Sequence, residues 1–319
     1  MSSHTIIQLT SPEDERDKTL NILSAGLLLC YILLLIPVIY NCYNYVYLQK
    51  RYKAFLCLSF YVLANAVIIL RICLYVIVLK NVYDDGVDKY FGYVYSNVLS
   101  TYFKIALGYA QLASMLELTI RLSSSAKIAL VELEDVNDRE GEKVVAYEVR
   151  NDKTSEQIKI NYLYGGLFAI DLSMLSVATW ECIDFKKSLK IAHQHGFDDD
   201  RTQNLENDLA LFGWISGGYF GILSIILIVT YYVLNKALNK MKAGKKTSKM
   251  RAEMKSMFLV FIITYIVRTI YQILQGNLYD LSSSFIGYCV GMTLPVLFDY
   301  SSIGAVLYLH FREMKLKKK

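Results

Sequence analysis

The chain has no polar stretch long enough to fold as a separate soluble domain. Of its 319 residues, the longest segment between apolar runs is residues 121–159, which has 39 residues. An independent domain normally needs roughly 50 residues or more. Hydrophobic residues make up 54% of the chain and come in blocks instead of being interleaved with polar ones. These two features exclude a soluble enzyme.

The motifs that carry catalysis are also missing. The sequence contains no phosphate-binding glycine loop, no nucleophile elbow and no Cys/His spacing typical of zinc sites. His193, His195 and the acidic residues 198–200 are the nearest approach to a metal cluster, and no second cluster accompanies them. We therefore predict that the protein is not an enzyme and uses no metal or cofactor.

Signals for oxidation, glycosylation and cleavage are scarce. Of the six cysteines, only Cys182 is a candidate for an oxidising aqueous face, and the chain has no Asn-x-Ser/Thr acceptor. Residues 1–18 lack a basic segment followed by an apolar core, so we expect no cleavable signal peptide. These features permit the plasma membrane and fit an internal membrane, endoplasmic reticulum or mitochondrial, at least as well.

Seven apolar runs, each with few or no charges, dominate the chain. A helix rises about 1.5 Å per residue, so about 20 residues cross the ~30 Å hydrocarbon layer. Only helices and closed barrels satisfy the backbone in lipid, and barrels show alternating segments of about 10 residues. We predict an all-α, multi-pass bundle of seven transmembrane helices. The runs are residues 19–40, 54–79, 91–120, 160–182, 209–234, 256–275 and 281–309.

The basic residues predict how this bundle is oriented. With the N-terminus outside, the inner loops and tail hold 23 Lys and Arg residues, whereas the outer segments hold 8. This bias favours an outer N-terminus and an inner C-terminus. The expected organisation is a polar tail over residues 1–18, a transmembrane domain over 19–309 that includes the cytoplasmic loop 121–159, and a basic tail over 310–319.

Ionisable residues inside membrane spans are costly and mark functional positions. Counted from the inner edge of each run, Asp171, Arg268 and Asp299 share one level near the midplane. Arg71 and Lys104 share a second level nearer the outside. We take these five residues as the candidate ligand-binding set.

Two interpretations of these charges stay open. In the first, Arg268 pairs with Asp299 and Asp171 pairs with Lys104, so that the charges only fix the register of the helices. In the second, three cations face two anions, and one positive charge is left over. Arg71 and Lys104 would then hold an anionic ligand, a carboxylate or a phosphate, between the helices.

The third loop, one proline and two glycine pairs give further structural expectations. Residues 142–150 alternate like a short strand. Pro295 is expected to kink the seventh span, and the Gly-Gly pairs at 165–166 and 217–218 to allow close helix packing.

Loop 235–255 has eight basic residues and one acidic residue, so we expect it to contact anionic lipids or a cytoplasmic protein partner. The contact residues would be Lys240, Lys242, Lys245, Lys246, Lys249 and Arg251; we expect no nucleic-acid partner.

Seven spans, an outer N-terminus, a basic fifth loop and the tail FREMKLKKK resemble the layout of seven-helix receptors of the G-protein-coupled type. The acidic stretch 132–142 makes the layout similar to that of the plant tobamovirus-multiplication seven-helix membrane proteins as well. Both resemblances concern layout only, because Glu117-Leu-Thr-Ile-Arg121 and Leu294-Pro295 stand where such receptors carry their signature motifs. They imply a receptor-like protein with a ligand site between helices.

Three classes of function remain. A receptor-like protein predicts a ligand cavity near the buried cations and a partner on the fifth loop. A non-catalytic subunit of a larger membrane complex, such as a mitochondrial one, predicts that other chains cover the apolar faces. A transporter predicts inverted repeats, and we find no convincing repeat in the sequence.

Overall fold

The computed structural model is a bundle of long helices. It describes residues 14–48, 55–79, 87–134, 141–195, 199–240, 245–277 and 285–317, and none of these residues lies in a strand. The elements are α2 (Asp14–Asn41), the π-helix η1 (Cys42–Leu48), α3 (Phe55–Leu79), α4 (Val87–Glu134), α5 (Gly141–His195), α6 (Asp199–Lys240), α7 (Lys245–Asn277) and α9 (Phe285–Lys317). The predicted all-α fold is confirmed for this part of the chain.

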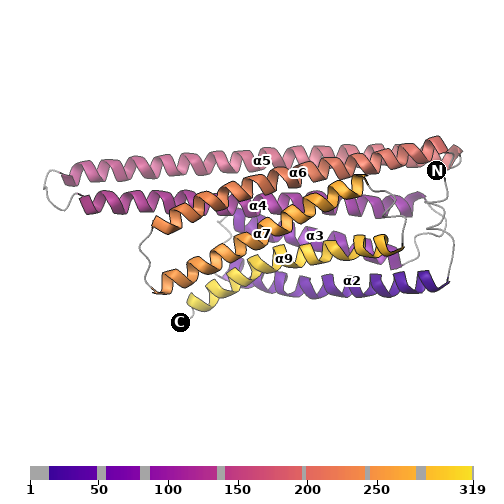
Figure 1. Ribbon diagram of the computed structural model, residues 1–319, viewed down its shortest axis with the longest axis horizontal. Coiled ribbons are helices and arrows are strands. Elements are labelled where there is room, and N and C mark those ends of the chain that lie inside the picture. Colours follow the sequence, from indigo (N-terminus) through magenta and orange to yellow (C-terminus); the bar gives the residue numbers. More distant parts are fainter. Residues whose placement is uncertain are drawn as a thin grey trace.

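Successive helices run antiparallel along the long axis of the bundle (Figure 1). Each predicted apolar run lies on a different helix, apart from residues 54 and 281–284, which are outside the described residues. As a result, α2 begins and α9 ends at opposite ends of the bundle (Figure 1). This arrangement is compatible with an odd number of membrane crossings.

Six of the helices are long and apolar enough to cross a membrane, and α4 is not among them. The reason lies in its composition, because Ser100, Thr101, Lys104 and Gln111 lower its hydropathy while being buried. α4 packs against α3, α5 and α6, so its polar side chains face other helices. The described part of the chain thus shows six candidate spans, three of which pack against α4.

The core is divided between the two sides of α4. One apolar cluster joins α4 to α5, α6 and α7, and includes Ile105, Leu223 and Tyr265. The other joins α2, α3 and α9. α9 packs on α2 and on α7, and so links the two halves.

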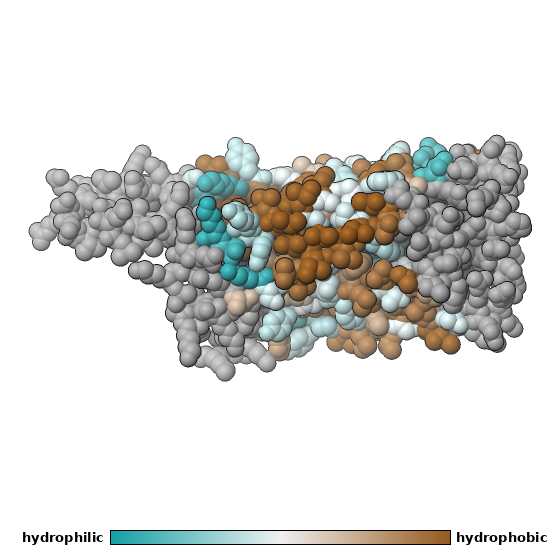
Figure 2. Space-filling model, in the orientation of Figure 1, coloured by the Kyte–Doolittle hydropathy of each residue, from teal (hydrophilic) through white to brown (hydrophobic). Residues whose placement is uncertain are grey.

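The outer surface carries an apolar band. On the face shown in Figure 2, hydrophobic residues occupy the middle of the bundle and hydrophilic ones lie toward its ends. Large side chains such as Ile22, Ile36 and Phe168 are more than 60% exposed. Exposed apolar surface of this extent is costly in water and is what a lipid-facing surface requires.

The prediction of a strand at residues 142–150 is wrong, because these residues lie in α5. A single short strand would leave its backbone groups unpaired, whereas a helix satisfies them within the segment. α4 and α5 continue past the other helices as an antiparallel pair at one end of the bundle (Figure 1). Residues 121–134 and 141–159 of the predicted loop are therefore helical, and residues 135–140 lie outside the described residues.

Candidate functional site

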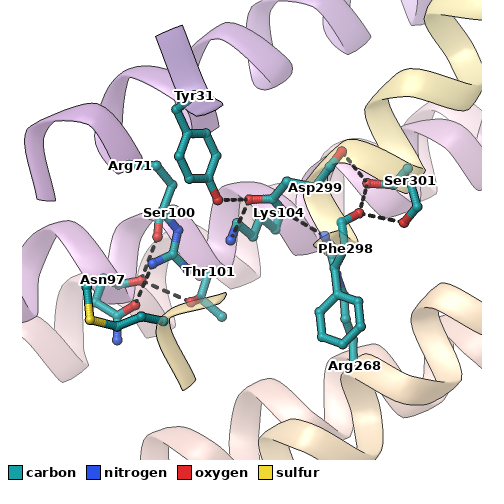
Figure 3. A network of polar contacts seen from close by, with 12 residues as sticks. Tyr31, Arg71, Asn97, Ser100, Thr101, Lys104, Arg268, Phe298, Asp299 and Ser301 are labelled. Atoms are coloured by element: carbon teal, nitrogen blue, oxygen red, sulfur yellow. Dashed lines mark hydrogen bonds and ion pairs between the residues drawn. The ribbon is translucent and has the colours of Figure 1, made fainter. Parts of the chain in front are cut away.

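Three side chains from three helices converge on the carboxylate of Asp299, which lies on α9 and is 1% exposed. Lys104 on α4 places its Nζ 2.8 Å from Oδ2, and Arg268 on α7 places its Nη2 2.6 Å from Oδ1. The hydroxyl of Tyr31 on α2 donates a hydrogen bond to Oδ2 at 2.6 Å. Asp299 therefore links four helices at one buried point (Figure 3).

Arg71 on α3 lies beside this point and contacts a neutral group instead of a carboxylate. Its Nη1 donates to the side-chain oxygen of Asn97 at 3.2 Å, as Figure 3 shows. Its Nε is buried and has no hydrogen-bond partner among the described residues. The charge of Arg71 acts on both Lys104 and Asp299, so the three groups belong to one electrostatic centre.

The regular spacing of polar residues on α4 explains why the centre forms there. Residues three and four apart lie on one face of a helix. Gln111 extends this face, because it accepts a hydrogen bond from the Tyr265 hydroxyl at 2.8 Å and donates to the carbonyl of Ser302 at 3.3 Å. The face consists of Asn97, Thr101, Lys104, Gly108 and Gln111.

Aromatic rings surround the guanidinium of Arg268. Its Cζ lies 5.7 Å from the ring centroid of Phe220, 5.4 Å from that of Tyr265 and 5.6 Å from that of Phe298. A desolvated guanidinium over an aromatic face gains about 2 kcal/mol. The charge of Arg268 is therefore stabilised by Asp299 and by ring faces together.

The centre carries more positive than negative charge. Arg71, Lys104 and Arg268 are each at most 6% exposed, and Asp299 is the one carboxylate that Lys104 and Arg268 contact among the described residues. Lys104 and Arg268 share this single carboxylate, and Arg71 has no ionic partner among the described residues, so the centre has a net excess of two positive charges. Because Arg268 has its ring faces, the excess is concentrated at Arg71 and Lys104.

The predicted charge pairs are correct in one case and wrong in the other. Arg268 pairs with Asp299 as expected. Lys104 pairs with Asp299 and not with Asp171, because its long side chain reaches the carboxylate on α9. Asp171 lies on α5, which packs against α4 and α6, and its Oδ1 is buried with no hydrogen-bond partner in the described part of the chain.

Sequence reasoning missed the uncharged members of the centre. Tyr31, Asn97 and Gln111 carry no charge, and an uncharged polar residue in an apolar run does not by itself indicate a functional site. The available signal is that Asn97 and Gln111 each lie seven residues, or two helical turns, from Lys104 and therefore on its face of α4. Polar residues repeated along one face of an apolar helix indicate a surface turned toward other helices.

The remaining site predictions fall on residues whose side chains are not described. Loop residues 241–244, which include Lys242, lie outside the described residues, and so do the side chains of Lys240, Lys245, Lys246, Lys249 and Arg251. The same holds for the side chains of His193 and His195. Among the residues that are described, no group of three His, Cys, Asp or Glu side chains is placed to hold a metal ion.

Comparison with known proteins gives no relative, since no family, curated protein or solved structure matches the chain.

Proposed function

We propose that the protein is a seven-pass, receptor-like membrane protein that binds a small anion at Arg71 and Lys104, in the centre of the bundle. The observation that supports this is the excess of two buried positive charges over the single carboxylate of Asp299. A buried charge without an ionic partner costs several kcal/mol. An anion between the two cations would remove most of that cost.

The contacts of each residue suggest its role. Arg71 has a donor free of partners among the described residues, Nε, and its Nη1 contacts only a neutral amide oxygen there. A guanidinium with open donors suits a carboxylate or a phosphate, which accept two parallel hydrogen bonds. Lys104 would add a second charge while Asp299 holds its ammonium group in place. Arg268 and Asp299 act as supporting residues in this proposal, and Asp171 is not included.

The experiment is thermal unfolding of the purified protein in detergent, in a buffer whose only other anion is a bulky sulfonate. Sodium acetate and sodium phosphate serve as probes at constant ionic strength. At 100 times the Kd, a ligand stabilises the folded state by about 2.7 kcal/mol, so the melting temperature should rise. Arg71→Gln and Lys104→Gln should each abolish the rise, and Lys190→Gln, which alters an exposed lysine on α5, should keep it.

Asp299→Asn provides a test of opposite sign. Removing the carboxylate leaves three buried cations, so this variant should be less stable without anion and gain more from acetate than the wild type does. A rise in melting temperature that is equal in all variants would contradict an anion site at the centre.

The receptor-like role is proposed in preference to transport because direct contacts among α2, α4, α7 and α9 close the centre. We expect no accumulation of radiolabelled acetate in vesicles that contain the protein. The basic loop 235–255 is proposed to contact a cytoplasmic partner, on the ground of its charge. Affinity purification in mild detergent should recover a substoichiometric partner; a stoichiometric set of chains would favour the membrane-complex alternative instead.

A further inference from the structure

A second buried polar site lies away from Asp299, between α4, α5 and α6. It is a small cavity of about 20 Å³, which is room for one group the size of a water molecule. It lies near the start of the apolar run of α4 and near the facing ends of the runs of α5 and α6. Its lining consists of Val94, Val98, Trp180, Glu181, Asp184, Phe185, Asp208, Leu211 and Phe212.

The charges of this cavity are all negative. Glu181 is 8% exposed, and both of its carboxylate oxygens are buried without a hydrogen-bond partner among the described residues. The Oδ2 of Asp208 on α6 is also buried and has no hydrogen-bond partner there. Asp184 follows Glu181 by three residues and therefore lies on the same face of α5. None of the nine lining residues is basic.

A buried carboxylate without a partner is a strong indication that a donor is to be supplied from outside. Buried polar atoms in folded proteins are nearly always hydrogen-bonded, and each exception requires an explanation. The buried hydroxyl of Tyr102 lies close enough to Glu181 to interact with it, but the two groups do not reach regular hydrogen-bond geometry. The cavity thus offers several oxygen acceptors to a group that carries donors and positive charge.

The rest of the wall is apolar and leads to the surface. Phe185 and Phe212 are buried, whereas Trp180 is 49% and Leu211 is 42% exposed. The two exposed residues belong to α5 and α6, so the cavity opens between these helices on the outer surface of the bundle. Glu181 and Asp208 lie at the edge of the predicted spans 160–182 and 209–234, which is the level of lipid headgroups.

We infer that this cavity binds a primary ammonium group with an apolar stem, supplied by an aminophospholipid headgroup or by a soluble alkylamine. An ammonium group has the size of water and three donors, and the cavity offers it the unpartnered carboxylate oxygens of Glu181 and Asp208. Aromatic walls stabilise its charge and stem. A bare metal ion fits less well, because metals need a fuller shell of oxygens and the described acids form no three-ligand group.

The two tryptophans of the chain make this inference testable by fluorescence. Trp214→Phe leaves Trp180, in the cavity wall, as the only tryptophan. Titration of this variant in detergent with propylammonium chloride should change the emission of Trp180 in a saturable manner. Propanol, tetramethylammonium and sodium chloride at the same concentrations should give no saturable change. A saturating response to sodium alone would overturn the inference in favour of an inorganic cation.

The carboxylate variants locate the response. In the single-tryptophan background, Glu181→Gln and Asp208→Asn should each weaken propylammonium binding at least tenfold. Both substitutions remove a buried unpartnered charge without changing side-chain volume, so we expect both variants to fold. Asp171→Asn alters another half-buried acid of α5, outside the cavity, and should leave binding unchanged. Binding that survives both cavity substitutions would refute the site.

Membrane composition identifies the source of the ammonium group. Nanodiscs of phosphatidylethanolamine should raise the melting temperature relative to nanodiscs of phosphatidylcholine, whose trimethylated nitrogen donates no hydrogen bond, and Glu181→Gln should remove the difference. Such a result assigns the cavity to a headgroup. Propylammonium binding without any lipid preference assigns it to a soluble amine. Arg71→Gln should alter neither propylammonium binding nor the lipid-dependent difference in melting temperature. The ammonium site is thus tested independently of the anion site.

Discussion

Asp299 is the residue on which the central network depends most. It is the common acceptor for Lys104, Arg268 and Tyr31, and it is almost fully buried. Removal of one partner from a buried ionic network costs about 3–5 kcal/mol, because the opposite charges are left uncompensated in a medium of low dielectric constant. The stability of the central network therefore depends mainly on one side chain of α9.

We expect Asp299→Ala to lower the free energy of unfolding by about 3–5 kcal/mol, since it leaves three cations without a carboxylate. Thermal unfolding in detergent, followed by the loss of monodisperse protein after heating, measures the change. Asp171→Ala is the matched control, because Asp171 is also a mid-span aspartate but lies outside the network. We expect the control to be neutral or mildly stabilising. Equal losses in the two variants would show that the contacts of Asp299 are not what stabilises the bundle.

For single residues, the sequence predicts which charged residues lie inside the bundle better than it predicts which residues they contact. Arg71, Lys104, Arg268 and Asp299 are evident as rare charges in apolar runs, because charge in hydrocarbon is costly enough to be informative alone. Counting depth along each run located Arg268 opposite Asp299, but it missed the reach of the Lys104 side chain. Helix tilt and the rotamer of a long side chain shift a contact by a turn or more, and a single sequence specifies neither.

At the scale of elements, the close approach of α4 to α6 and α7 depends on Gly108. A Cβ added there would lie 2.5 Å from Cδ2 of Leu223 and 2.8 Å from the hydroxyl of Tyr265. Both neighbours are fully buried, and Tyr265 is held by its hydrogen bond to Gln111. One or both of these buried side chains would have to shift to make room for a Cβ at residue 108.

We therefore predict that Gly108→Ala destabilises the bundle by about 1–3 kcal/mol, the usual cost of overpacking a core. Gly218→Ala is the control, because nothing lies within 4 Å of its added Cβ. Alanine is favoured over glycine inside a helix by about 0.5–1 kcal/mol, so the control should be neutral or more stable. The comparison uses the same thermal assay. Identical melting temperatures for the two variants would contradict a tight α4 contact.

The glycine pattern shows how far element packing could be anticipated. The Gly-Gly pairs at 165–166 and 217–218 suggested close packing, yet only Gly217 has a near neighbour, with Cγ1 of Ile273 at 3.0 Å from its added Cβ. A single glycine, Gly108, makes the tighter contact. Glycine content is visible in a sequence, but the face on which a partner helix lies depends on tertiary packing.

The whole molecule combines an apolar exterior with a charged interior. Runs of about 20 apolar residues identify the helices that face lipid, because every residue of such a run counts toward the same signal. The central helix α4 is not among the candidate spans, since buried polar residues lie within its apolar run. Apolar length therefore predicts the exterior reliably, whereas the identity of the central helix emerges from the packing of α3, α5 and α6 around it.

Orientation in the membrane is the last property that the charge pattern predicts. The antiparallel course of the helices places the 196–198 connection and the 241–244 connection at opposite ends of α6 (Figure 1). The 23 to 8 distribution of basic residues predicts that the first connection lies outside and the second inside. Because the chain has no natural Asn-x-Ser/Thr acceptor, an engineered acceptor reports its own position without background.

We expect an Asn-Ser-Thr insertion at residues 196–198 to be glycosylated when the chain is translated with microsomes, and the same insertion at 241–244 to stay unmodified. α5 extends to His195 and α6 begins at Asp199, so the acceptor stands well beyond the predicted span ends and within reach of the transferase. A mobility shift that endoglycosidase H removes is the measurement. Modification at 241–244 alone would reverse the orientation. Modification at both would mean that α6 does not cross the bilayer.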